Sequence, residues 1–427
     1  MCGIVGAVAE RNVVPILMEG LRRLEYRGYD SAGIAVVEDG KIQRMRKVGK
    51  VQELTTALEE HPVSGVLGIS HTRWATHGVP NETNAHPHMS GSDVAIVHNG
   101  IIENYEELRD DLKEQGYTFV TDTDTEVVAH RIARHLKEAD DLTGAVKKTV
   151  AELEGAFALV VMSSNHPGQL VLARAGCPVV IGLGIEENFV ASDVAALLPV
   201  TRKFMFLEEG DIALIERTNV TIWDADDREV ARRVKESELT ADAAERGKFR
   251  HYMQKEIHEQ AQAVARTLSD RIADGRVLDA AFGPKANDAL DKTKGMHIVA
   301  CGTSYHAGLV ARYWVEQLCR IPCSVEIASE YRYRSPVVPA DTLFVTSSQS
   351  GETADTLAAL RAAKEAGYLS TLTICNVPES SMVRDSDLVM MTHAGPEIGV
   401  ASTKAFTTQL AALALLTIAL ARRAGLE

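Results

Sequence analysis

The apolar positions in the first half of the chain predict short strands mixed with helices. Runs rich in Ile, Val and Ala predict strands at 4–8, 32–37, 66–71, 94–98, 156–162, 170–173, 179–183, 189–191, 211–215 and 220–223. Helical spacing predicts helices at 13–24, 105–115 and 125–136. Because strands and helices do not alternate regularly here, the pattern predicts an α+β domain.

From residue 296 onward the pattern changes to regular alternation. Strands are predicted at 296–300, 324–328, 342–347, 371–375 and 388–392, and helices at 307–318, 354–366 and 403–422. This order predicts an α/β domain with a doubly wound parallel sheet, which binds ligands at the carboxyl ends of its strands. The stretch 225–250 is charged and poor in apolar residues, which is typical of a linker. We therefore expect one domain over 2–224, a charged linker over 225–250 and a second domain over 251–427.

Composition and charge restrict the class of protein. At roughly 100–200 residues per domain, 427 residues fit two to four domains. A hydrophobic share of 45% with 24% charged residues is globular, and a net charge of −14 disfavours nucleic acid as a partner. The six cysteines form no CxxC pair, which suits a reducing cytosol.

Targeting segments are not predicted either. The N-terminal stretch lacks a basic region followed by an apolar one, so we expect no signal peptide. The apolar run 410–421 is shorter than the ~20 residues of a membrane span and predicts a buried helix. We therefore expect a soluble, cytoplasmic protein with no membrane partner.

Cys2 directly follows Met1, which creates a specific chemical possibility. Removal of Met1 gives Cys2 a free α-amine, whose reference pKa of about 7.7–8.0 leaves much of it neutral in the cytosol. One residue then supplies both a nucleophile and a base. On position alone, an ordinary buried cysteine at the start of a strand is the simpler interpretation.

Three further segments change that judgement. The sequence HTRWATHG (71–78) follows one predicted strand, HNG (98–100) follows another, and TDTE (123–126) opens a helix. Loop positions on a strand scaffold are where chemistry is usually placed. Together with CGIVG (2–6) and LEYRGYDS (24–31), they resemble the glutaminase domain of the N-terminal-nucleophile amidotransferases, from Cys2 to about Trp223. The resemblance implies an N-terminal-nucleophile fold with α/β/β/α layers.

The resemblance also implies roles for individual residues. Cys2 is the expected nucleophile, with Asn99 and the backbone N–H of Gly100 as an oxyanion hole. Arg73 is expected to grip the α-carboxylate of glutamine through its planar fork, and Asp124 to face the α-ammonium. Further glutamine contacts are implied for Trp74, as a lid residue, and for Thr76 and His77.

A cluster of histidines offers a metal-site alternative in the same region. The histidines at 71, 77, 86, 88 and 98 are five of the 14 in the chain. Zinc sites also need suitable spacing and an activating carboxylate, and no HExxH motif is present. We prefer the interpretation that these histidines hydrogen-bond loops around a pocket, and we keep a metal-dependent hydrolase as a less favoured alternative.

The second domain has three loops that open helices, at CGTSYHAG (301–308), TSSQSGET (346–353) and GVASTKAF (399–406). Hydroxyls and free N–H groups at a helix N-terminus form an anion site, although serine-rich helix caps are common. Neither a Walker A motif nor GxGxxG occurs in these places, so a nucleotide is not indicated. The loops resemble the sugar-isomerase (SIS) phosphosugar-binding domain. That resemblance implies that phosphate is held by Ser348, Ser350 and Thr353, and that the sugar is lined by Ser304, Gln349, Val400 and Ala401. It gives Lys404 a structural role.

The order of the two domains, joined by HYMQKEI (251–257), resembles the glucosamine-6-phosphate synthase family, the isomerising glutamine–fructose-6-phosphate aminotransferases. Members hydrolyse L-glutamine at the N-terminal cysteine and deliver the ammonia to fructose 6-phosphate, forming glucosamine 6-phosphate for amino-sugar biosynthesis. The resemblance implies no cofactor and no metal, and we expect a homodimer.

One departure from the family concerns its second SIS domain and C-terminal tail, which the printed 427 residues do not include. We therefore expect these residues to hydrolyse glutamine while making little amino sugar. We also expect apolar residues of the last helix, Leu413, Leu416 and Ile418, to be exposed. A glutaminase regulated by a non-catalytic sugar-phosphate-binding module remains an alternative.

Overall fold

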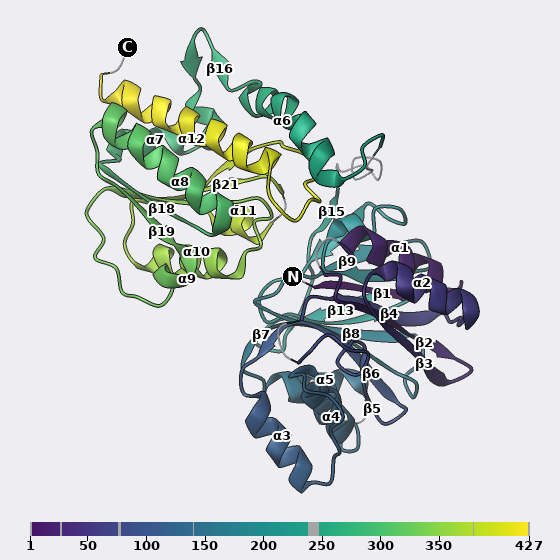
Figure 1. The fold of residues 1–427 in the computed structure, drawn as a ribbon. Coiled ribbons are helices and arrows are strands. Elements are labelled where there is room, and N and C mark those ends of the chain that lie inside the picture. The colour runs from purple at the N-terminus through teal and green to yellow at the C-terminus, as the bar shows by residue number, and fades with distance from the viewer. Residues whose placement is uncertain are drawn as a thin grey trace. The chain divides into compact units, whose positions relative to one another are not determined.

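The computed structural model describes residues 2–25, 28–75, 78–139, 141–237, 247–378 and 380–425 (Figure 1). The chain divides into two compact units, Met1–Asp242 and Ala243–Glu427. The division falls within the charged segment 225–250. Each unit is described by itself below.

The first unit contains two antiparallel sheets. One has eight strands in the order β15-β11-β9-β10-β1-β4-β2-β3, and the other has seven in the order β14-β13-β12-β8-β7-β6-β5. The strands are β1 Gly3–Val8, β2 Ser31–Glu38, β3 Lys41–Val48, β4 Leu67–Arg73, β5 His88–Ser90, β6 Val94–Ile102, β7 Gly155–Ser163, β8 Gln169–Ala175, β9 Val180–Leu183, β10 Asn188–Ala191, β11 Lys203–Phe206, β12 Ile212–Glu216, β13 Val220–Trp223, β14 Glu229–Val230 and β15 Val234–Glu236. The helices are α1 Val14–Leu24, α2 Val51–Glu60, α3 Tyr105–Glu114, α4 Thr125–His135 and α5 Leu142–Val150.

The sheets pack face to face between two layers of helices. Along β1, Ile4 and Val8 belong to the core between the sheets, while Val5 and Ala7 belong to the core under α1. A strand directs successive side chains to opposite faces, so a strand buried on both faces is apolar throughout. A third core joins the seven-stranded sheet to α4 and α5. The four layers confirm the predicted α/β/β/α fold.

Two predictions about this unit need correction. The loops that were expected to carry the site begin later than predicted, because β4 runs to Arg73 and β6 runs through Asn99 and Gly100 to Ile102. The charged segment 225–250 is also not linker throughout. Its first part forms β14 and β15, which pair with β13 and β11 at the edges of the two sheets, where polar strands are tolerated.

The second unit is built on a five-stranded parallel sheet in the order β19-β18-β20-β21-β22. These strands are β18 Gly295–Ala300, β19 Cys323–Ile327, β20 Thr342–Ser348, β21 Ser370–Cys375 and β22 Leu388–Met391. A hairpin of β16 Ile272–Ala273 and β17 Arg276–Val277 precedes them. The helices are α6 Tyr252–Leu268, α7 Ala286–Lys292, α8 Gly302–Trp314, α9 Ala328–Tyr331, α10 Ala354–Glu365, α11 Ser381–Asp385 and α12 Lys404–Arg423.

Helices cover both faces of this sheet, as the predicted doubly wound fold requires. Ile298 belongs to the core shared with α7, α8 and α12, and the next residue, Val299, belongs to the core shared with α9, α10 and α11. The strand order reverses direction between β18 and β20, which is the crevice where doubly wound sheets bind ligands. The loops that follow these two strands are those predicted to hold a sugar phosphate.

Helix α12 is long and apolar enough to cross a membrane by length and composition, so the predicted run 410–421 understates it. In the structure, 67% of its most apolar window is buried, and core helices of soluble proteins share these properties. The prediction of exposed apolar residues was wrong for Leu413 and Leu416, which are 1% and 0% exposed, because they pack in the core under α8. Ile418 is 40% exposed, as expected.

Candidate active site

Cys2 lies just before β1, and its thiol meets the backbone of Trp74. The Trp74 N–H donates to Sγ at 3.2 Å, and Sγ lies 3.5 Å from the Trp74 carbonyl oxygen. The contact follows from register, since Gly3 pairs with Thr72 and so aligns the start of the chain with the end of β4. Burial raises the pKa of the Cys2 thiol, while the Trp74 hydrogen bond and the charge of Arg73 oppose the rise. A thiol of raised pKa needs a base to become a nucleophile.

Arg73, near this thiol, and Asp124 supply buried charges of opposite sign. Each is 4% exposed. Burial lowers the pKa of Arg73, and the charges of Cys2, Asp124 and Asp30 oppose that effect, which indicates that these groups lie within electrostatic reach of the guanidinium. The Asp124 carboxylate accepts the Ile102 N–H at 2.9 Å at the start of α4.

Asn99 and Gly100 lie inside β6, beside Cys2. The Asn99 side-chain amide donates from Nδ2 to the Cys2 carbonyl oxygen at 3.2 Å. Gly100 has a φ of +130°, and a Cβ there would lie 1.9 Å from the Ala156 oxygen, so the position accepts only glycine. The predicted oxyanion-hole residue Asn99 is thus held against Cys2 by a hydrogen bond, and Gly100 follows it in the same strand.

Trp74 is half exposed, at 41%, and packs edge-on against Tyr29 with ring centroids 5.4 Å apart. An exposed ring beside the thiol is compatible with its predicted lid role. Thr76 and His77, the other two predicted glutamine contacts, lie outside the described residues.

Two residues of this site, Asp30 and His71, were not predicted to contribute to it. Asp30 accepts the Ala75 N–H at 2.8 Å and its charge raises the pKa of Cys2. His71 lies 3.0 Å through Nε2 from Asn99 Oδ1. His71 opens the motif 71–78 and belongs to the histidine cluster, but its partner Asn99 is 28 residues away, so spacing did not mark the pair.

The described histidines of the cluster, at 71, 86, 88 and 98, are engaged in protein contacts. His86 Nδ1 accepts the His98 N–H at 3.3 Å, and His88 Nε2 lies 3.3 Å from Thr123 Oγ1. Burial lowers the pKa of His71 to about 3, and burial holds the pKa of His86 and of His88 well below the ordinary value. Within the described ranges, no group of three or more His, Cys, Asp or Glu side chains is arranged to hold a metal ion.

In the second unit, the loop after β20 turns sharply into α10. Ser348 Oγ accepts the Gly351 N–H at 3.0 Å and lies 3.2 Å from Thr353 Oγ1, while Ser350 Oγ accepts the Glu352 N–H at 3.2 Å. Gly351 has a φ of +65°, and a Cβ there would lie 2.0 Å from Ser380 Oγ. The loop thus gathers three hydroxyls at the N-terminus of a 12-residue helix.

The remaining predicted sugar contacts come from three segments. Ser304 is buried in the first turn of α8, beyond the carboxyl end of β18. Gln349 follows β20 directly, and its carbonyl oxygen lies 3.8 Å from Cys375 Sγ. Val400 is 70% exposed, and with the exposed Ala401 it lies in the segment before α12.

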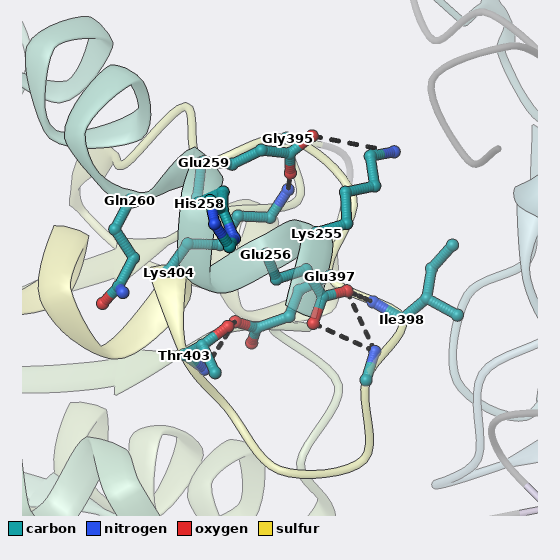
Figure 2. Close-up of polar contacts among 12 residues, drawn as sticks. Lys255, Glu256, His258, Glu259, Gln260, Gly395, Glu397, Ile398, Thr403 and Lys404 are labelled. Carbon is teal, nitrogen blue, oxygen red and sulfur yellow. Dashed lines mark hydrogen bonds and ion pairs between the residues drawn. The ribbon is translucent and has the colours of Figure 1, made fainter. Parts of the chain in front are cut away.

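That segment, 395–403, is held by two carboxylates, and Figure 2 shows how they approach it. Glu256 of α6 is buried and accepts the N–H groups of Ile398 and Gly399 at 2.5 and 2.9 Å. Glu397 accepts the N–H groups of Thr403 and Ala405 at 2.8 and 3.0 Å, which closes the other end of the segment. We call residues 395–403 the sugar loop below.

Comparison with known proteins identifies both halves of the chain. A family profile described as a glutamine amidotransferase domain matches residues 71–199, and one described as a SIS domain matches residues 289–419. Two curated relatives match all of this chain over 70% of their own length. They are the isomerising glutamine–fructose-6-phosphate aminotransferases of Pseudomonas putida, 61% identical, and of Escherichia coli, 59% identical.

Among solved structures, the C-terminal domain of glucosamine-fructose-6-phosphate aminotransferase from Francisella tularensis is 55% identical, with a TM-score of 0.41. The match covers 42% of this chain and 51% of that one. On the relatives' identity and coverage, the chain belongs to the isomerising glutamine–fructose-6-phosphate aminotransferases, which use glutamine to aminate fructose 6-phosphate.

Proposed function

We propose that the glutaminase half of this reaction takes place at Cys2. The supporting observation is that Cys2 has a backbone donor on its sulfur, from Trp74, and a side-chain donor on its carbonyl, from Asn99. The proposed nucleophile and the proposed oxyanion donor therefore lie side by side, because Asn99 contacts the same residue that carries the thiol. With Met1 removed, the α-amine of Cys2 takes the thiol proton.

The reaction then runs through a thioester. The sulfur attacks the side-chain carboxamide carbon of glutamine, and Asn99 Nδ2 and the Gly100 N–H stabilise the oxyanion. The protonated α-amine returns its proton to the leaving nitrogen, the C–N bond breaks, and ammonia departs. Water, deprotonated by the same amine, cleaves the thioester to glutamate and restores the thiol.

Arg73 and Asp124 are proposed to select glutamine by its two backbone charges. A guanidinium and a carboxylate that are both buried bind an α-carboxylate and an α-ammonium strongly, because little water screens them. Trp74, with Thr76 and His77, completes the proposed glutamine site.

Fructose 6-phosphate is proposed to bind at the switch point of the second unit. Ser348, Ser350 and Thr353 would hold the phosphate at the N-terminus of α10, where the helix dipole favours an anion. Ser304, Gln349, Val400 and Ala401 would line the sugar. We further propose that the protein acts in the cytoplasm and that it forms a homodimer. Light scattering on purified protein would test the dimer.

A dual assay tests this assignment on the 427 residues by themselves. Glutamate and amino sugar are counted separately in the presence of glutamine and fructose 6-phosphate. We expect glutamate without matching amino sugar, because the resemblance assigns the acid–base groups for isomerisation to the family's second SIS domain. General acid–base catalysis contributes about 10²–10⁴-fold to such a step. Amino sugar in step with glutamate would contradict this part. A sugar-phosphate sensor without a catalytic role would instead show fructose 6-phosphate binding but no amination even with the full-length family sequence.

A further inference from the structure

His71 meets two acceptors through one ring nitrogen. Its Nε2 lies 3.0 Å from the His98 carbonyl oxygen and 3.0 Å from Asn99 Oδ1. Neither oxygen can donate, so Nε2 carries the hydrogen and donates to both. The other nitrogen, Nδ1, is buried and has no hydrogen-bond partner among the described residues, which is tolerable for an acceptor and costly for a donor.

The surroundings keep His71 neutral and fixed in place. Its side chain is 1% exposed, and its ring stacks on that of His86 at 4.2 Å between centroids. Burial lowers its pKa to about 3, with the charge of Arg73 acting in the same direction. The neutral ring therefore presents one N–H toward Asn99 at neutral pH.

This donor decides which way the Asn99 amide faces. With Oδ1 turned to His71, Nδ2 is turned to Cys2 and donates one hydrogen to its carbonyl. An amide nitrogen has two hydrogens, so one remains for the oxyanion. A flipped amide would place Oδ1 against the Cys2 carbonyl and the developing negative charge, and would supply no donor.

We propose that His71 is a positioning residue for glutamine hydrolysis, which holds the Asn99 amide in the orientation that serves the oxyanion hole. His71 touches neither substrate nor sulfur in this proposal. Support of a functional side chain by a second, rigid hydrogen bond is a general requirement for an accurate site. The proposal rests on the proposed roles of Cys2 and Asn99.

The test compares His71→Leu with His71→Gln in the full chain. Leucine fills the space and removes the donor. We therefore expect kcat for glutamine hydrolysis to fall by about 10- to 100-fold, with KM nearly unchanged. This fall is smaller than the loss of about 10²–10³-fold that follows removal of a whole oxyanion donor. Glutamine places its Nε2 the same number of bonds from Cα as histidine does, so His71→Gln should recover most of kcat. His130→Gln is a matched control, because His130 is also buried, belongs to α4, and contacts Ser90 and Glu126 rather than Asn99.

Two further measurements separate this role from general damage. Alkylation of Cys2 by iodoacetamide forms no oxyanion, so its rate should not change in His71→Leu. In an Asn99→Ala background, His71→Leu should lower kcat no further, because both changes remove the same interaction.

The proposal fails if His71→Leu keeps wild-type kcat or slows alkylation as much as hydrolysis. It also fails if His71→Leu lowers kcat by the same factor in the Asn99→Ala background as in the wild type. If His71→Leu does not fold, nitrogen NMR of the wild-type imidazole decides. The expected tautomer carries its hydrogen on Nε2, and a hydrogen on Nδ1 would overturn the proposal.

A separate observation concerns Glu256, which the mechanism above does not use. Both of its oxygens contact the backbone of the sugar loop directly before Val400, with Oε2 3.2 Å from the Gly399 nitrogen (Figure 2). A Cβ at Gly399 would lie 2.5 Å from Oε2, so any larger residue there would displace the Glu256 carboxylate. The contact fixes the peptide that leads into the exposed Val400–Ala401 pair.

We infer that Glu256 is a positioning residue for the sugar part of the ligand. This rests on the proposed binding of fructose 6-phosphate. Glu256→Gln replaces one carboxylate oxygen with an NH₂ group, which cannot accept from the N–H groups of Ile398 and Gly399. We therefore expect the Kd of fructose 6-phosphate to rise about tenfold. The Kd of inorganic phosphate should not change, because the loop 348–353 is a different segment. Gly399→Ala disturbs the same contact from the other side and should have the same effect.

Glu316→Gln, on the turn that follows α8, is the control, because Glu316 pairs with Arg312 and is partly exposed. Equal losses of sugar-phosphate and phosphate affinity, or no loss in either variant, would refute the role of Glu256. Wild-type protein that binds no fructose 6-phosphate would instead refute the proposed function.

Discussion

Lys404 Nζ lies 2.6 Å from Glu259 Oε2, which joins the first residue of α12 to α6. The lysine side chain is only 3% exposed, and that of Glu259 is 27% exposed. A lysine held in this way is committed to a structural pair rather than free to attack a sugar carbonyl. The finding agrees with the structural role that the sequence implied for Lys404.

Replacing Lys404 by Met should destabilise the second unit and leave glutamine hydrolysis intact. Removing one partner of a buried pair costs about 3–5 kcal/mol, and the partial exposure of Glu259 places this pair at the lower end. Thermal unfolding measures the loss, with Glu259→Gln as the partner variant. A Lys404→Met protein of wild-type stability that binds no fructose 6-phosphate would give the lysine a functional role instead.

Asn99 and Arg73 should produce opposite kinetic signatures. Asn99→Ala should lower kcat for glutamine hydrolysis by about 10²–10³ with little change in KM, because the donor acts on charge that develops in the transition state. Arg73→Ala or Arg73→Lys should mainly raise KM, because the α-carboxylate is held in ground and transition states alike. Steady-state kinetics distinguish the two effects. A KM effect for Asn99→Ala with a kcat effect for the Arg73 variants would contradict the assigned roles.

The pKa of Cys2 should move in opposite directions when its two charged neighbours are neutralised. The charge of Asp30 raises this pKa and that of Arg73 lowers it, although burial is the larger cause. Asp30→Asn should therefore move the midpoint of iodoacetamide alkylation to lower pH, and Arg73→Gln should move it to higher pH. Shifts in the same direction would mean that changes in burial outweigh the charges.

Ser350→Ala should weaken fructose 6-phosphate binding without affecting glutamine hydrolysis. A hydrogen bond to a charged group is worth about 1.5–3 kcal/mol, so the Kd should rise by at least about tenfold. Calorimetric titration provides the measurement. Ser370→Ala is the matched control, since Ser370 starts β21 at the opposite end of the sheet. Equal effects of the two changes would argue against a phosphate site at the loop 348–353.

The sequence predicted the buried elements well and the polar ones poorly. Strand 4–8 and the central parallel strands β18, β20 and β21 were predicted because buried strands form nearly continuous apolar runs. By contrast β3, with the sequence KIQRMRKV, was missed because it is a largely exposed edge strand without an apolar run. The roles of His71 and Glu256 were not predictable from spacing, because each depends on the register of segments 28 or more than 140 residues apart.

Covalent labelling of Cys2 tests the central claim most directly. The chain is treated with an electrophilic glutamine analogue, and intact and peptide masses locate the adduct. We predict one adduct per chain, on Cys2 of protein that has lost Met1, with glutamine protecting the site and Cys301 unlabelled as an internal reference. An adduct on any other cysteine, or full glutaminase activity in protein that retains Met1, would contradict the account.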